Sequence, residues 1–220
     1  MGLHLHLYAT PDHLRLDGAC DLDLRLRLST DERLTIYPAA AKLGAIASYA
    51  GIGITWGFSL RGPAGDVPIQ ELRTWYGPPG NPPSPEWAKR DAIVLAPGTH
   101  HEVAMPACWV PNSELDPASL DPQQLDPQGM DNIRPRDASS VMWPTPPLAE
   151  RVDLARCSAI VFAPLQALQR SKVDFLRGHV VAFVPAPGEY ELVASYSQAS
   201  FMGVGDNASA VAPPARFTIG

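Results

Sequence analysis

The chain has 220 residues, including 24 prolines, and carries a formal net charge of −6 with only 18% charged residues. The acidic balance and the lack of any Lys or Arg run exclude a non-specific nucleic-acid binder, which needs a basic surface. The proline content argues against a helical bundle, because proline shortens helices and strands and favours loops and sheet edges. A chain of this length can form one domain with a core that needs no disulfide or metal.

Residues 38–60 are rich in apolar side chains, but Lys42 and glycines 44, 51, 53 and 57 interrupt them, so we expect no membrane span. The first residues lack the basic and apolar regions of a secretory signal. The three cysteines (20, 108 and 157) are odd in number and have no metal-type spacing. They are typical of reduced thiols, and we predict a cytoplasmic protein.

The clearest local pattern is CDLDLRLRL at residues 20–28, in which apolar and charged side chains alternate. A strand sends successive side chains to opposite faces, so this pattern predicts a strand with leucines inward and a solvated row of Asp21, Asp23, Arg25 and Arg27 outward. Similar runs predict strands at 3–8, 13–16, 33–38 and 54–60. Residues 38–51 are predicted as a short helix or coil, and the proline-rich residues 77–85 as a stiff loop.

Farther along, residues 92–98 are predicted as a strand that ends in a Pro-Gly turn, with 100–105 returning beside it. Three tandem LDP units occupy 115–129, and we interpret about 111–150 as a long irregular insertion. The apolar run 159–163 predicts a buried strand, and 165–178 fits a short amphipathic helix between Pro164 and Gly178. Two strands on either side of the PAPG turn at 185–188 and a closing strand at 215–220 complete the prediction.

The segment PGEYELVASY resembles a late strand of bacterial immunoglobulin-like domains, in which a Pro-Gly turn leads into Tyr-x-Leu-x-Ala-x-Tyr. The matching residues are Pro187, Gly188, Tyr190, Leu192, Ala194 and Tyr196. Residues 95–98, 213–219 and 21–38 are similar to the mid-domain turn, the closing strand and the second and third strands. Related domains include fibronectin-like modules and small intracellular proteinase inhibitors. The resemblance implies a single all-β domain over 1–220, an antiparallel immunoglobulin-like β-sandwich with one or two short helices and the proline-rich insertion, and it transfers no functional residue.

Candidate chemistry is sparse. His100, His101 and Glu102 with Cys108 form the best cluster of ligand types, but adjacent histidines in a strand point to opposite faces. His4 and His6 share a face but need a third ligand from elsewhere, so we predict neither a metal site nor a cofactor. Cys108 is the one cysteine expected on a loop, where a thiol nucleophile would need a histidine base. Motifs such as GxSxG, HExxH, the P-loop and GxGxxG are absent from the sequence.

Aromatic side chains near predicted loops are the remaining signal, because Trp and Tyr are enriched at binding hot spots. Alternatively, the tryptophans close the ends of the sandwich. We predict a non-enzymatic module that binds another protein, as an inhibitor, immunity or assembly factor, through Trp- and Pro-bearing loops. A metal- or thiol-dependent hydrolase using His100, His101 or Cys108 and a structural subunit of a larger assembly are the alternatives. The predicted partner-binding residues are Trp75, Tyr76, Trp87, Trp109 and Trp143.

Overall fold

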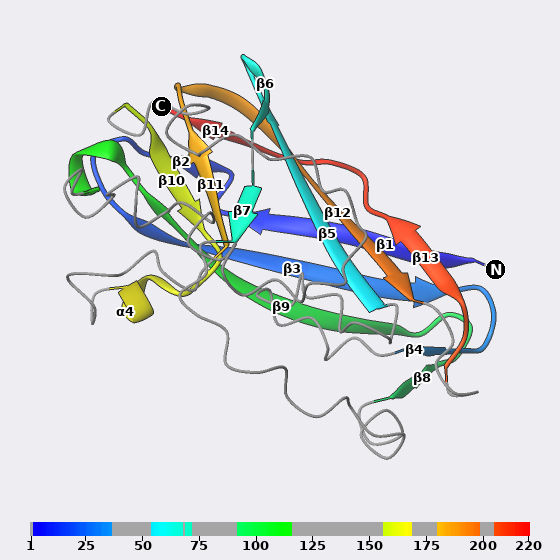
Figure 1. Ribbon diagram of the computed structural model, residues 1–220. Helices are drawn as coiled ribbons and strands as arrows, with labels where there is room; N and C mark the ends of the chain where they lie inside the picture. The colour runs from blue at the N-terminus through cyan, green and yellow to red at the C-terminus, as the bar shows by residue number, and fades with distance from the viewer. Residues whose placement is uncertain are drawn as a thin grey trace, which may run out of the picture.

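The computed structural model of the chain describes residues 2–36, 54–67, 69–71, 92–115, 156–168, 180–198 and 205–220 (Figure 1). Regular structure in these ranges is almost entirely β-strand, with one short α-helix, α4 (Leu165–Leu168), and one 3-10 turn, η2 (Asn112–Glu114). The all-β prediction is therefore confirmed. The predictions for 38–51, 77–85 and the LDP units lie outside the described residues, except that Leu115 is described.

The strands form two large sheets and a small one. The first sheet has the order β1 (Leu3–Thr10), β3 (Cys20–Thr30), β9 (His100–Val110), β10 (Ser158–Val161), β11 (Val180–Val184) and β7 (Ile69–Glu71), antiparallel throughout. The second has the order β2 (His13–Leu14), β14 (Ala215–Ile219), β12 (Gly188–Gln198), β5 (Ile54–Gly62) and β6 (Gly65–Val67), with β13 (Ala208–Val211) also on β12. The small sheet pairs β4 (Leu34–Ile36) with β8 (Ile93–Leu95).

The inner faces of the two large sheets share one apolar core. Alternation in β3 buries Leu22, Leu24, Leu26 and Leu28 completely, as the sequence predicts. These leucines belong to the same cluster as the inward residues of β12, which are Tyr190, Leu192, Ala194 and Tyr196. Burial of each leucine stabilises the fold by about 1.5–3 kcal/mol relative to an exposed position.

A second apolar cluster lies on the outer face of the first sheet, where β9, β10 and β11 meet. It contains Cys108, Val110, Leu115, Cys157, Ala159, Val161, Ala163, Leu168, Val181 and Phe183. All four residues of β10 are consequently buried, because this strand is covered on both faces. Burial on both faces explains why the sequence of β10 is a continuous apolar run rather than an alternating one.

One predicted pairing is wrong. Strand β9 does not return beside β8: it is eleven residues long and pairs with β3, while β8 pairs with β4. Strands β11 and β12 lie in different sheets, because the chain crosses between the layers at 185–187. The short β2–β14 pair is parallel. Strands β5 and β6 form an antiparallel hairpin whose turn has Gly65 at φ +111°.

Candidate functional site

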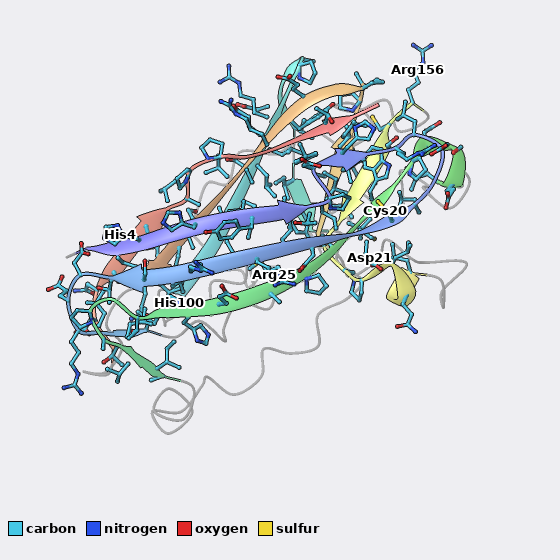
Figure 2. The ribbon with its side chains drawn as sticks, turned by 180° about the vertical axis from the view of Figure 1, so that it is seen from behind. His4, Cys20, Asp21, Arg25, His100 and Arg156 are labelled. Atoms are coloured by element: carbon cyan, nitrogen blue, oxygen red, sulfur yellow. The ribbon has the colours of Figure 1, made fainter. Side chains whose placement is uncertain are left out.

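The outer face of β1, β3 and β9 is polar (Figure 2). Arg25 contacts Asp23 at 2.7 Å, and Arg27 contacts Glu102 across the strands at 2.7 Å. The hydrogen bond from Arg27 holds the pKa of the Glu102 carboxyl below its usual range. The Arg27 guanidinium also lies 5.7 Å from the ring centroid of Tyr8. The predicted solvated row is therefore observed, with its charges paired in part within and across strands.

A hollow of about 360 Å³ opens at one end of this face. We call it the histidine hollow; it is lined by His4, His6, Tyr8, Arg27, Ser29, Thr30, Asp31, Gly98, Thr99 and His100. His4 Nε2 lies 2.7 Å from Asp31 Oδ2. In the cross-strand register, His4 is opposite Ser29, and Ser29 is opposite His100. The structure thus brings His100 to the hollow that contains the His4–His6 pair.

His101 lies on the other face of β9, opposite Leu28, and partial burial lowers its pKa. The prediction that His100 and His101 point to opposite faces is confirmed. Within the ranges that the structure describes, no three His, Cys, Asp or Glu side chains form a group that could hold a metal ion.

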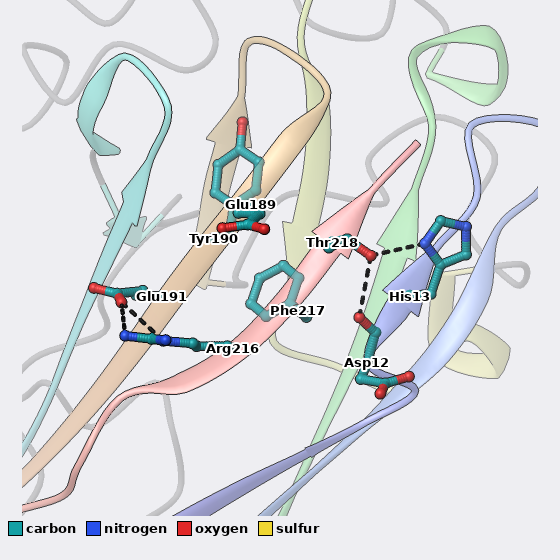
Figure 3. Close-up of a pocket in the computed structure, with 8 residues that line it drawn as sticks. All are labelled: Asp12, His13, Glu189, Tyr190, Glu191, Arg216, Phe217 and Thr218. Carbon is teal, nitrogen blue, oxygen red and sulfur yellow. Dashed lines mark hydrogen bonds and ion pairs between the residues drawn. The ribbon is translucent and has the colours of Figure 1, made fainter.

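A second hollow, of about 460 Å³, lies over β2, β14 and β12 (Figure 3). It is lined by Asp12, His13, Glu189, Tyr190, Glu191, Arg216, Phe217 and Thr218. Arg216 pairs with Glu191 at 3.0 Å, and His13 Nδ1 lies 2.8 Å from the Thr218 hydroxyl. The Thr218 backbone N–H donates to the Asp12 carbonyl at 2.8 Å. A hydroxyl–imidazole pair can serve nucleophilic chemistry, but here both side chains are exposed, and their contact fastens β2 to β14.

The third feature is the base of the segment 116–155, at the junction of β9 and β10. Asn112 donates from its side chain to the Cys157 carbonyl at 2.9 Å and from its backbone to Ser158 Oγ at 3.0 Å. The Glu114 carboxylate accepts the Ala19 N–H at 2.9 Å, and Leu115 is buried. Both ends of the segment are therefore held at one place on the first sheet.

The same junction is tied to the following helix and to the preceding turn. Asp21 Oδ1 accepts the backbone N–H of Leu165, the first residue of α4, at 2.9 Å. The indole of Trp109 donates to the Arg15 carbonyl at 2.7 Å. These isolated polar residues were not singled out from the sequence for this role, and residues 111–114 were predicted only as part of the irregular insertion.

Of the predicted partner-binding residues, Trp75, Tyr76, Trp87 and Trp143 lie outside the described residues. Trp109 does not lie on a loop but on the inward face of β9, where it is completely buried in the main core. A buried indole cannot contact a partner, so the prediction for Trp109 is wrong. Its burial follows from alternation with Met105 and Ala107, which a loop assignment overlooks.

Cys108 also lies on β9 rather than on a loop, and it is completely buried. Burial is the main cause that raises the pKa of this thiol to about 12, and the nearby Asp21 and Cys20 contribute less to the shift. The thiolate is the nucleophilic form of cysteine, so this thiol is unsuited to catalysis at neutral pH. Cys20 and Cys157 are likewise not in a disulfide.

Comparison with family models, with curated proteins and with solved structures found no match to this chain. Among the described residues, the structure contains no helix long and apolar enough to cross a membrane.

Proposed function

We propose that the chain is an immunoglobulin-like β-sandwich. In that fold strands A, B and E share one sheet and strands C, F and G the other. Six strands have a matching distribution and order, since β1, β3 and β9 are neighbours in the first sheet and β14, β12 and β5 are neighbours in the second. A second support is Tyr190, near the start of β12, whose hydroxyl donates to the Ala186 carbonyl at 2.5 Å. A tyrosine bonded to the backbone a few residues upstream is a hallmark of such domains.

On this scaffold we place a non-enzymatic protein-binding module that acts through its long connections. The observation that carries the proposal is the base of 116–155, where Asn112, Glu114 and Leu115 hold the segment at the β9–β10 junction. Binding residues are concentrated on loops that a rigid scaffold positions. We propose that this proline-rich insertion and the connections bearing Trp75, Tyr76, Trp87 and Trp143 contact a partner protein. None of the three cysteines is in a disulfide, which supports a reducing, cytoplasmic location.

The hydrolase alternative finds less support. It needs an accessible thiolate or a metal, whereas Cys108 is buried with a pKa of about 12. His100 and His101 lie on opposite faces of β9, so they cannot act together on one substrate atom.

The proposal is tested by replacing residues 117–154 with a short Gly-Ser linker and by substituting Trp75→Ala and Trp87→Ala in the intact chain. We expect a partner captured by the wild-type protein to be lost from these variants. Arg25→Ala, on the exposed outer face of β3, is the matched control and should retain the partner. Full retention by the linker variant and by both tryptophan variants would contradict binding through the loops.

A further inference from the structure

His4 and His6 occupy the same outward face of β1, and both line the histidine hollow. They are two positions apart in a regular strand, which puts their Cα atoms about 7 Å apart. Two imidazoles at this spacing can turn toward a common ion at a metal–nitrogen distance of about 2.0–2.1 Å. Both side chains are exposed, so neither needs the core to rearrange.

The contact of His4 with Asp31 prepares one of these ligands. His4 Nε2 lies 2.7 Å from Asp31 Oδ2. Because an ionised carboxylate only accepts hydrogen bonds, this contact favours the tautomer of the neutral imidazole that carries its N–H on Nε2 and keeps the lone pair on Nδ1. Histidines that bind metals usually donate their second ring N–H to a carboxylate or a carbonyl in this way. The carboxylate comes from the turn between β3 and β4, whereas His4 lies in β1.

We propose that His4 and His6 form a two-histidine site for a borderline divalent cation, of which Zn²⁺ is the representative. Imidazole nitrogen favours Zn²⁺ and its neighbours over Mg²⁺ and Ca²⁺, which prefer oxygen. His100 lines the same hollow, but two strand spacings, about 10 Å, separate its backbone from β1. The site therefore has two protein ligands, in agreement with the lack of a three-residue group in the described ranges.

The charges around the hollow are compatible with a bound cation. Arg27 lies opposite His6 and brings a positive charge, but its guanidinium contacts Glu102 at 2.7 Å. Asp31 adds a negative charge beside His4, and water completes the coordination of the ion. This inference is independent of the proposed function, because it concerns the sheet face and not the loops.

The test is titration of the tag-free full chain with ZnCl₂, followed by calorimetry. We expect one equivalent to bind, and we expect His4→Asn and His6→Asn each to weaken binding at least tenfold. Asp31→Asn should weaken it by about tenfold, since loss of a carboxylate that orients a ligand typically has such an effect. His13→Asn is the matched control, because His13 is exposed but lies in the other hollow; it should bind as the wild type does. MgCl₂ should give no saturable binding.

Histidine side-chain NMR signals supply the second readout. Zn²⁺ should shift the ring signals of His4 and His6 and leave those of His13 and His101 in place. Thermal unfolding of each variant verifies that it is folded, which we expect because the substituted side chains are exposed. A lack of saturable Zn²⁺ binding, equal weakening by His13→Asn, or shifts that omit His4 and His6 would each overturn the proposal.

Discussion

The hydroxyl of Tyr190 gives the sharpest test of how the two sheets are joined. Its ring is buried and stacks on Phe217 with centroids 5.9 Å apart, and its hydroxyl donates to the Ala186 carbonyl at 2.5 Å. Tyr190→Phe keeps the ring and removes this one hydrogen bond. The net value of such a bond is about 1 kcal/mol, and the partly buried Ala186 carbonyl loses its partner. We expect a loss of about 1–2 kcal/mol in the free energy of unfolding.

For a domain of this size, that loss lowers the melting temperature by about 3–6 °C, measured by calorimetry or by urea unfolding. Tyr8→Phe is the matched control: Tyr8 is 47% exposed, and its ring contact with Arg27 survives the change. Equal stability of Tyr190→Phe and the wild type would refute the reasoning, and so would an equal loss in both variants.

A substitution at Gly62 should disturb the same Tyr190 side chain. A Cβ built on Gly62 would lie 2.3 Å from Tyr190 Cε1, so Gly62→Ala must displace the ring. Overpacking of this kind typically costs about 1–3 kcal/mol. Because a displaced ring already loses its bond to Ala186, Gly62→Ala and Tyr190→Phe should destabilise together by less than their sum. Strict additivity would contradict the coupling.

Three further predictions concern other groups. Cys108 keeps its proton to about pH 12 in the folded state but ionises from about pH 9 when unfolded, so its contribution to stability is lost as the pH rises between these values. The free energy of unfolding of Cys108→Ala, measured with urea, should therefore fall less steeply with pH in this range than that of the wild type. Equal slopes of the free energy against pH would contradict this. The Gln198 amide donates to the Thr35 and Asp206 carbonyls at 3.0 and 2.7 Å, and Gln198→Leu removes both hydrogen bonds. This substitution should lower the free energy of unfolding by about 2–4 kcal/mol and speed amide exchange in β4. Unchanged exchange would show that Gln198 does not hold β4 in place. Arg27→Ala should leave thermal unfolding nearly unchanged, because exposed ion pairs contribute little, and a clear loss would show that the pair supports the sheet.

Individual strands could be predicted wherever the alternation of apolar and polar residues indicates which face of the sheet each side chain occupies. In β3, β12 and β14 the two-residue alternation specifies strand and inward side chains without knowledge of any neighbour. The inward leucines of β3 share one core with the inward residues of β12, which are Tyr190, Leu192, Ala194 and Tyr196.

Pairing was less predictable, because alternation carries no information about the partner. Strand β9 pairs with β3, far back in the sequence, rather than with its neighbour β8. Trp109 and Cys108 were assigned to a loop because prolines flank them, yet the second cluster buries the outer face there and the main core buries the inner face. Anchors such as Asn112 and Glu114 are single polar residues, and only the fold shows which backbone groups they meet.

The β9–β10 junction shows how the two ends of the segment 116–155 are held close together. Its two ends are already joined by the Val110–Ala159 pairing and by the bonds of Asn112 to Cys157 and Ser158. Closing a loop between fixed ends costs entropy that grows by about 0.6 kcal/mol for each doubling of loop length. Replacing 117–154 with a six-residue Gly-Ser linker, with Leu115 retained, should therefore raise the free energy of unfolding by about 1–2 kcal/mol in urea unfolding.

The buried cluster beside the junction decides whether this reasoning holds. If Leu115, Leu168 and Phe183 are packed by the residues of their own cluster, the shortened chain keeps that packing and folds cooperatively. If instead the deleted segment supplies part of the cover, the variant exposes apolar surface at about 25 cal/mol per Å² and becomes less stable. A lower free energy of unfolding in the shortened variant would show that residues 117–154 contribute to the core. A higher one would indicate that these residues do not stabilise the domain and are available for binding.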